Sequence, residues 1–366
     1  MRVQIVDPPA YTPPYDRALC AALTAAGADV ELVTTRFPYG PVPVAEDYCV
    51  TELFYPRASR RAADDRYRQA LRLLEHVPGM RRLRAHSREA DIIHLQWSSL
   101  PTLDRHLLPK RPRVFTMHDP LPDSGRRRRA WLELLKRMDA VIAHSAAGVA
   151  GLGDAGIDAA RLHRVPHGVF EHLTDRDDER SLPPELAAVQ APVILFFGLV
   201  RPYKGVDVLL EAFRELDGAE LWIVGMPRMD LAEYKRMAKA CSGRVRFVSR
   251  FITDPEIASY FRRADVVALP YRQIEQSGVL YTALAFAKPV VASAVGGFSE
   301  VGATGAIRLV EPGNAEELAA ALAQLAADPS AREQLGIAAQ RAASGVYSWS
   351  AIAERTLDVY RGLLHG

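Results

Sequence analysis

The sequence predicts an α/β protein built from two doubly wound, parallel-sheet domains. Short runs rich in Val and Ile alternate with amphipathic helical patterns through both halves of the chain, and one polar segment separates the halves. This alternation is typical of parallel strands joined by right-handed helical crossovers. Because ligands of such sheets bind beyond the carboxyl ends of the strands, functional side chains are expected in the loops that follow each strand.

The strands are expected in two series. In the first half they cover 2–6, 29–34, 91–96, 113–118 and 139–145, with a short closing strand, LHRVP, that ends at Pro166; in the second half they cover 192–198, 220–225, 244–249, 265–270 and 289–293. The chain is expected to be helical from Ala315 onward. The predicted organisation is a first domain over 1–170, a linker over 171–190, a second domain over 191–345, and a terminal helix over 346–366 that packs back on the first domain.

Composition places the chain among ordinary globular proteins. It has 366 residues, of which 49% are hydrophobic and 25% charged, which fits two domains of roughly 150 residues. Cys20, Cys49 and Cys241 are too scattered to predict a disulfide framework or a metal cluster. The first residues do not read as a signal peptide, and no apolar window approaches the ~18 residues of a membrane span. A cytoplasmic protein is expected.

The formal charge of +2 is unevenly distributed, with +6 over residues 1–170 and −4 over the remainder. Basic clusters lie at 57–61, 81–88 and 126–129. Such clusters attract anionic lipid headgroups with about 1 kcal/mol per charge, which leaves open a peripheral contact at the inner face of the membrane. The alternative is a set of solvated helix faces. No recognised motif for nucleic acid accompanies the charge.

The segment from Leu269 to Ser293 is the most informative part of the sequence. A strand ends at Pro270, a polar loop follows, and a helix is expected to begin at Ser277 and Gly278. A helix that begins at the carboxyl edge of a parallel sheet presents unpaired N–H groups and about half a positive charge. This arrangement predicts a phosphate site.

A second loop, FFGLVRPYKG, adds two cations to the same predicted sheet edge. Gly198 ends the strand, Arg201 and Lys204 follow, and Gly205 allows the turn into an amphipathic helix. Hydrogen bonds to charged groups contribute roughly 1.5 to 3 kcal/mol each, so the two cations predict a diphosphate clamp. The alternative is a pair of surface charges in a polar loop.

At this point the sequence resembles a known family. The motifs GLVRPYKG, VGMP, LPY, SGVLYTALAFAKPVVAS and GGFSE, in this order, are similar to the donor domain of the retaining GT-B glycosyltransferases of family four, the group 1 glycosyltransferases. The resemblance extends over the first half through TMHD, AHS and VPHGVF, and to the end through SWSAIAERTLDVY. It covers essentially the whole chain and implies two Rossmann-like domains that face a central cleft, with a hinge closing on the donor.

The resemblance implies roles for individual residues. Arg201 and Lys204 would bind the diphosphate of a nucleotide sugar and neutralise the leaving group, without a metal. The remaining implied donor contacts are Gly198, the nucleobase-binding stretch Arg250, Phe251 and Ile252, and the distal-phosphate group Ser277, Gly278 and Val279. His118, which follows a strand in the first half, would approach the donor sugar; the alternative is a hydrogen-bonded structural histidine.

One departure from the family pattern concerns two glutamates that usually lie eight positions apart. One register places Thr282 where the second is expected, and the other places Glu275 where the first is expected, so neither gives two carboxylates. A neutral threonine is a weaker partner for a ribose hydroxyl than a carboxylate. The donor-facing group is therefore expected to be Glu275, Gln276 and Ser277.

The loop after the first strand contains four prolines and no glycine, which argues against a nicotinamide or flavin cofactor. Family members use this loop for the acceptor, so the resemblance makes Tyr11, Tyr15 and Asp16 acceptor contacts, with Trp97 as a sugar platform. The alternative is a proline-stiffened loop whose aromatic residues only pack.

The function predicted from the sequence is retaining transfer of a sugar from a nucleotide-diphosphate sugar, as cosubstrate, to an acceptor that is a glycan, a lipid-linked sugar or a small metabolite. No cofactor and no metal are expected. Two alternatives stay open: a noncatalytic subunit that binds nucleotide sugar, and an epimerase or phosphorylase on the same two-domain architecture.

Overall fold

The apolar runs of the sequence build two parallel sheets, one in each of two compact units. The computed structural model describes residues 1–37, 42, 45, 47–61, 65–274 and 276–365. Unit 1 consists of Met1–Pro166 together with Trp349–Gly366, and unit 2 is His167–Ser348. The last helix of the chain therefore belongs to the same unit as the first strand, and each unit is described by itself.

The sheet of unit 1 has seven parallel strands in the order β3-β2-β1-β4-β5-β6-β7. Their bounds are β1 Arg2–Val6, β2 Asp29–Thr34, β3 Cys49–Glu52, β4 Ile92–Leu95, β5 Arg113–Met117, β6 Ala140–Ala143 and β7 Leu162–Arg164. Six of these confirm the predicted strands. β3 was not predicted, because it is a short edge strand without a buried residue and its pattern carries no hydrophobic run.

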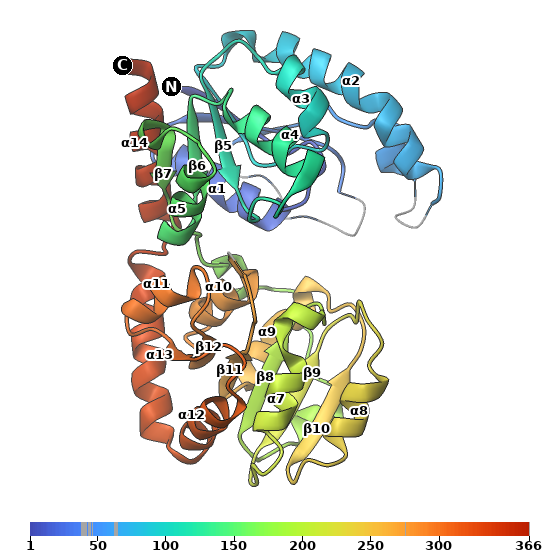
Figure 1. Ribbon diagram of the computed structural model, residues 1–366, viewed down its shortest axis with the longest axis vertical. Coiled ribbons are helices and arrows are strands. Elements are labelled where there is room, and N and C mark those ends of the chain that lie inside the picture. The colour runs from blue at the N-terminus through green and yellow to red at the C-terminus, as the bar shows by residue number, and fades with distance from the viewer. Residues whose placement is uncertain (38–41, 43–44, 46, 62–64, 275, 366) are drawn as a thin grey trace. The chain divides into compact units, whose positions relative to one another are not determined.

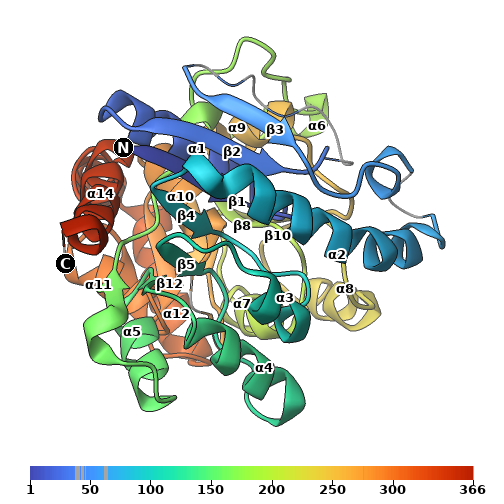
Figure 2. The same cartoon turned by 90° about the horizontal axis from the view of Figure 1, so that it is seen from above.

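Two helical layers cover the two faces of this sheet. Alternate strand residues, such as Ile5 and Val6 of β1, enter different apolar clusters, as the two-residue repeat of a strand requires. α1 (Pro13–Ala25) and α14 (Trp349–His365) pack together on one face. The other face is covered by α2 Arg68–His86, α3 Pro101–Leu107, α4 Gly125–Leu135 and α5 Ala146–Asp154 (Figure 1). Figure 2 shows α2 and α3 from above.

The sheet of unit 2 has six parallel strands in the order β10-β9-β8-β11-β12-β13. Their bounds are β8 Val193–Phe197, β9 Glu220–Val224, β10 Arg244–Val248, β11 Val266–Leu269, β12 Val290–Ser293 and β13 Arg308–Val310. The five strands predicted here are confirmed. β13, a three-residue edge strand, was not predicted, since three residues carry too little pattern to be recognised.

Helices surround the unit 2 sheet and share one apolar core with it. Their bounds are α6 Pro184–Ala187, α7 Val206–Ala212, α8 Ala232–Ala238, α9 Asp254–Arg263, α10 Gly278–Ala285, α11 Phe298–Ala303, α12 Ala315–Ala327 and α13 Pro329–Ser344. The helix expected at Ser277 and Gly278 is confirmed, because Ser277 is the N-cap residue of α10. The helical character expected from Ala315 onward is confirmed by α12, α13 and α14.

Strand order creates one switch point in each sheet. β1 lies between β2 and β4, and β8 lies between β9 and β11, so the chain leaves in opposite directions from two neighbouring strands. In doubly wound sheets, the loops that follow such strands at the carboxyl edge are where ligands bind. The loops concerned are 7–12 and 96–100 in unit 1, and 198–205, 270–274 and 276–277 in unit 2.

Gly225 is the tightest point of the unit 2 edge, and Gly225→Ala is expected to destabilise the protein by about 2 to 3 kcal/mol. Its φ is +143°, and an added Cβ would lie 2.0 Å from the carbonyl oxygen of Gly198. Gly218 also has positive φ, +75°, but nothing lies within 4 Å of an added Cβ. Gly218→Ala is therefore the matched control, costing about 1 kcal/mol of backbone strain alone. Urea denaturation of the variants measures the difference, and equal costs would contradict the proposed overlap.

Candidate functional site

Three segments of unit 2 meet at the carboxyl edge beside Gly198. An added Cβ on this glycine would lie 3.2 Å from Nζ of Lys204 and 3.3 Å from Cγ2 of Val279. Gly205, which has φ +67°, brings the loop equally close to the end of β11, since its added Cβ would lie 2.0 Å from the carbonyl oxygen of Pro270. Because Gly198 and Gly205 have no side chains, the Lys204 ammonium group and the first turn of α10 can both lie against the end of β8.

Lys204 is the buried cation of this edge. Its side chain is 7% exposed and its Nζ lies 4.9 Å from the centroid of the Tyr271 ring, over the ring face. Within the described part of the chain it forms no ion pair with a carboxylate. Burying an ammonium without a countercharge is costly, and an aromatic face compensates only about 0.5 to 2 kcal/mol of that cost. The position is therefore suited to an anionic ligand.

Arg201, the second predicted cation, is placed differently. It precedes the short helix η5 (Pro202–Lys204), and its side chain is exposed. The structure records no hydrogen bond or ion pair of its guanidinium among the described residues. The two cations lie on one loop, but only Lys204 is held by its surroundings.

The first turn of α10 supplies free donors next to Lys204. The N–H groups of Gly278 and Val279 have no acceptor among the described residues, because they precede the first intrahelical hydrogen bond. Ser277 is buried, and its hydroxyl lies 3.5 Å from the hydroxyl of Tyr271. Gln276 accepts a hydrogen bond of 2.5 Å from Tyr281 through Oε1. The N–H groups of Gly278 and Val279 are donors of the kind that bind phosphate at a helix start.

Of the two residues that align with the family glutamates, Thr282 and Glu275, the structure describes only Thr282. Thr282 is buried, and its hydroxyl donates a 2.9 Å hydrogen bond to the carbonyl oxygen of Gly278, four residues earlier in the same helix. The hydroxyl of Thr282 therefore already donates its proton within the helix. To donate to a ribose hydroxyl, as expected from the sequence, it would have to give up this hydrogen bond. Glu275 lies outside the described residues.

The predicted nucleobase-binding stretch follows β10. Arg250 is tied to Glu256 by hydrogen bonds of 2.5 and 3.1 Å, and these hydrogen bonds lower the pKa of the Glu256 carboxyl to about 2. Ile252 is buried, whereas the Phe251 ring is 53% exposed. An exposed ring next to a fixed guanidinium offers a surface on which a planar base can stack.

In unit 1, the predicted histidine His118 lies within a cluster of polar and aromatic side chains. Its Nε2 lies 2.9 Å from Oε1 of Gln96, and its Nδ1 lies 3.2 Å from Nε2 of His144. Burial lowers the pKa of His144 to about 4, so His144 is neutral near pH 7. Its Nδ1–H donates to the Val165 carbonyl, and its Nε2 therefore accepts a proton donated by Nδ1 of His118.

On the other side of His118, the orientation of the Gln96 carboxamide decides which protonation state of the ring is favoured. When the Gln96 oxygen faces His118, Nε2 must carry a proton and the ring is an imidazolium. A half-turn of the carboxamide would present an N–H to a neutral ring instead, and the Gln96 Nε2 group is buried without a hydrogen-bond partner among the described residues. Gln96 can thus support either protonation state of His118.

The predicted acceptor residues surround this histidine. Trp97 stacks on His118 with ring centroids 5.2 Å apart, donates a 2.9 Å hydrogen bond to the Thr12 hydroxyl, and meets the exposed ring of Tyr11 edge-on. Tyr15 is buried and approaches the His118 ring edge-on at 4.8 Å. Tyr11 and Trp97 are the members of the set that solvent reaches.

Asp16 forms a buried pair with Asp7 at the end of β1. The two side chains are 1% and 0% exposed, and a hydrogen bond joins their carboxyl groups. Burial raises the pKa of Asp7 to about 6, and burial together with the Asp7 charge raises the pKa of Asp16. With both ionised, Oδ1 of Asp7 would have no donor, so one proton is held between the two. The second carboxylate oxygen of Asp7 accepts from the Tyr11 N–H at 2.7 Å.

Several site residues escaped the sequence analysis. Gln96 and His144 follow β4 and β6 just as His118 follows β5, so their place after adjacent strands was the available signal. Tyr271 is the second residue after β11, but nothing in the sequence indicates that its ring supports Lys204. Among the described residues, no cluster of three or more His, Cys, Asp or Glu side chains offers a metal site.

Solved structures share this architecture over the full chain. Sucrose-phosphate synthase from Thermosynechococcus elongatus aligns with a TM-score of 0.75 at 22% identity, covering 100% of this chain and 99% of that one. The Anabaena protein HepE in complex with UDP and glucose aligns with a TM-score of 0.73 at 21% identity, covering 99% of this chain and 100% of that one. At these identities the likeness concerns the fold, and the fold is that of the GT-B glycosyltransferases.

Family models assign the two halves. The model for glycosyltransferase family 4 matches residues 17–171, and the model for group 1 glycosyl transferases matches residues 191–328. The chain belongs to family four of the GT-B glycosyltransferases, the group 1 glycosyltransferases. The resemblance drawn from the motifs is thereby confirmed.

Curated relatives carry related names. D-inositol 3-phosphate glycosyltransferase of Xylanimonas cellulosilytica is 29% identical over 94% of this chain and 90% of its own length. The enzyme of the same name from Kineococcus radiotolerans is 32% identical over 56% of this chain and 53% of its own length. A GDP-mannose:glycolipid 4-beta-D-mannosyltransferase of Xanthomonas campestris is 30% identical over 55% of this chain and 61% of its own. The match thus spans about half of some relatives and nearly all of another.

Proposed function

We propose that the protein transfers a sugar from a nucleotide-diphosphate sugar to an acceptor hydroxyl with retention of configuration at the anomeric carbon. The observation that carries this proposal is Lys204, a buried ammonium without a carboxylate partner among the described residues, beside the free N–H groups of Gly278 and Val279. A diphosphate supplies the countercharge that this edge lacks. HepE bound to UDP and UDP-glucose, and a relative named for GDP-mannose, support the nucleotide-sugar class.

The chemistry follows from the charges. The bond between the anomeric carbon and the distal phosphate oxygen breaks, a bond to the acceptor oxygen forms, and the acceptor proton passes to the departing phosphate on the same face of the sugar. Lys204 and the α10 donors stabilise the negative charge that develops on the leaving diphosphate. No residue of unit 2 has to form a covalent intermediate in this route.

Unit 1 is proposed to contribute the residues that bind the acceptor. His118, which is hydrogen-bonded to Gln96 and His144, is proposed to lie beside the reacting groups, and Trp97 and Tyr11 give aromatic faces of the kind that pack on sugar rings. No described helix is both long and apolar enough to cross a bilayer. The acceptor class is left to experiment.

The donor is identified by thermal unfolding with UDP, GDP, ADP and TDP and then by turnover with the matching sugar nucleotides. A nucleotide at 100 times its dissociation constant should add about 2.7 kcal/mol to the free energy of unfolding. If one nucleotide binds but its sugar conjugate is neither hydrolysed nor used for transfer to any acceptor tried, the noncatalytic binding subunit would be favoured instead.

His118→Ala separates the two roles. We expect kcat to fall about a hundredfold, since a positioned acid–base or hydrogen-bonding group contributes 10² to 10⁴. The nucleotide-induced stabilisation should stay as in the unaltered protein, because the nucleotide is proposed to bind unit 2. His365→Ala, which changes an exposed histidine at the end of α14, is the matched control. Turnover at the normal rate in His118→Ala would remove this residue from the mechanism.

A further inference from the structure

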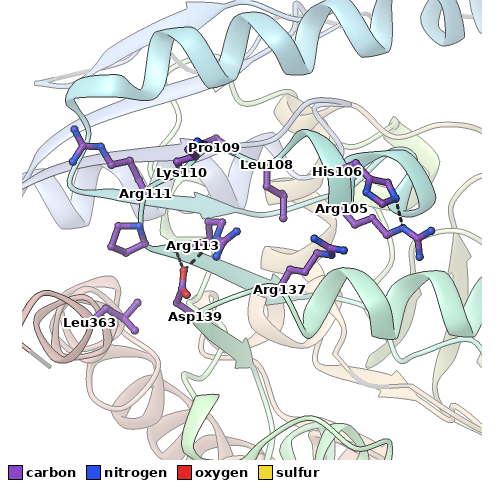
Figure 3. Close-up of a pocket in the computed structure, with 11 residues that line it drawn as sticks. Arg105, His106, Leu108, Pro109, Lys110, Arg111, Arg113, Arg137, Asp139 and Leu363 are labelled. Carbon is purple, nitrogen blue, oxygen red and sulfur yellow. Dashed lines mark hydrogen bonds and ion pairs between the residues drawn. The ribbon is translucent and has the colours of Figure 1, made fainter.

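A cavity of about 690 Å³ opens at the amino ends of β5 and β6, two neighbouring strands of unit 1. It is bordered by the segment 105–113, which ends α3 and enters β5, by residues 137 and 139 ahead of β6, and by Leu363 of α14. Figure 3 shows Arg113 directed at Asp139, with Lys110 and Arg111 on one side of the cavity and Arg137 on the other.

A second cavity of about 530 Å³ adjoins the first. It is bordered by the C-terminal part of α2, and the two cavities share Lys110 and Arg111. Together their walls carry one lysine and seven arginines against a single carboxylate; the arginines are Arg81, Arg84, Arg88, Arg105, Arg111, Arg113 and Arg137, and the carboxylate is Asp139.

Part of this charge is already neutralised. Nε of Arg113 lies 3.2 Å from Oδ2 of Asp139, Arg105 is paired with Glu133, and Arg111 donates to the carbonyl oxygen of Arg88. Lys110 and Arg137 differ from these. Their side chains are exposed and have no hydrogen bond or ion pair among the residues that the structure describes. Two cations without such a partner therefore border the same cavity, and the neighbouring arginines add to its positive charge.

The cavity is separate from the proposed acceptor site around His118. Arg113 is the first residue of β5 and His118 follows its last residue, so the cavity and His118 lie at opposite ends of the strand. At about 3.3 Å per residue, the five residues of β5 separate the two ends by roughly 17 Å. A ligand in this cavity would therefore not be the acceptor hydroxyl. It would be a different molecule or a distant part of the acceptor.

We infer that this cavity is a binding site for a phosphate-bearing anion, separate from the nucleotide-sugar site. Its volume lies within the range of small-molecule sites, about 300 to 1,000 Å³. Arginine forks bind phosphate oxygens in pairs of parallel hydrogen bonds, and a lysine adds a mobile point charge. The ligand is either a soluble phosphate compound or the headgroup of an anionic lipid, since both present the same chemistry to the cavity.

The test uses the full chain and a double variant, Lys110→Gln/Arg137→Gln, which removes two cations whose side chains have no hydrogen bond or ion pair in the described part of the chain. The control, Arg214→Gln/Lys239→Gln, makes the same change of charge at two exposed positions of unit 2 that line neither cavity. Hydrogen exchange of peptides covering 81–88 and 105–113 is followed during titration with inorganic pyrophosphate. This readout is local, so binding of pyrophosphate in unit 2 does not contribute.

For a soluble ligand, pyrophosphate should protect these peptides in the unaltered protein and in the control. The cavity variant should need about thirtyfold more pyrophosphate. Each lost charge weakens binding by about 1 kcal/mol, and about 1.4 kcal/mol corresponds to a factor of ten. For a lipid ligand, vesicles of phosphatidylglycerol, but not of phosphatidylcholine, should sediment the protein and the control and not the cavity variant. The inference is overturned if pyrophosphate does not protect the peptides and phosphatidylglycerol vesicles do not sediment the protein, or if the cavity variant and the control lose binding equally.

Discussion

Replacing Lys204 with methionine is expected to lower kcat/KM for the nucleotide sugar by about a thousandfold. The buried ammonium is proposed to oppose the charge of the leaving diphosphate, and removal of one such preorganised group costs about 10² to 10³ in kcat, to which the weaker donor binding adds. The nucleotide-induced rise in thermal stability should disappear in the same variant. Steady-state kinetics and thermal unfolding with nucleotide measure the two effects.

The same substitution should leave the folded state intact or make it more stable. Lys204 is 7% exposed and has no carboxylate partner among the described residues, so methionine removes a desolvated charge while keeping the contact with Tyr271. Loss of activity together with unchanged or raised thermal stability would therefore assign the effect to the ligand. Lys235→Met changes an exposed lysine of α8 and should alter neither quantity. If Lys204→Met kept both turnover and the nucleotide effect, the phosphate site would lie elsewhere.

Arg201 serves as a second measure of the clamp. Its exposed guanidinium has no hydrogen bond or ion pair among the described residues, so Arg201→Gln is expected to weaken donor binding less than Lys204→Met does. A larger effect of Arg201→Gln would mean that the loop folds over the ligand and brings the guanidinium to the phosphates.

Asp16→Asn is expected to change how stability depends on pH. In the folded protein the pKa of Asp7 is raised to about 6, above its ordinary value of about 4, and that of Asp16 is raised as well. The folded state therefore keeps protons that the unfolded chain has released, and stability falls as the pH rises through that window. Two units of pKa at Asp7 correspond to about 3 kcal/mol of stability present near pH 4 and lost above pH 6.

In Asp16→Asn the side-chain amide can donate to the Asp7 carboxylate in place of the shared proton. The variant should accordingly be more stable than the unaltered protein at pH 8, and its free energy of unfolding should be flatter between pH 4 and 7. Urea denaturation at several pH values measures this. Asp154→Asn, at an exposed position of unit 1, controls for the loss of one carboxylate. Parallel pH profiles for the unaltered protein and Asp16→Asn would show that the pair is ionised throughout.

Much of the fold could be predicted from the sequence, because buried parallel strands leave continuous runs such as VILFF of β8 and VVAL of β11. The edge strands β3 and β13 could not, since a strand paired on one side needs no such run. The start of α10 was predicted from Ser277 and Gly278, whose residue types favour a helix start over a helix interior.

The candidate site divides in the same way. Lys204 and His118 were predicted because each follows a strand, and in parallel sheets that position places a residue at the ligand-binding edge. The partners were not predicted: Tyr271 beneath Lys204, and Gln96 and His144 on either side of His118, come from strands far away in the sequence. Asp16 was expected to contact the acceptor, and nothing in the sequence showed that it shares a proton with Asp7.

The sequence by itself determined the two-sheet architecture, the family and the loops that carry the site, because residue pattern and spacing are local properties of the chain. The tertiary structure alone decided which cation of the FFGLVRPYKG loop is buried, that Thr282 is bonded to its own helix, and that cations from α2, α3 and the approach to β6 border one pair of cavities. Burial, charge pairing and pKa depend on which distant segments become neighbours, and strand order fixes those neighbours only when the sheet forms.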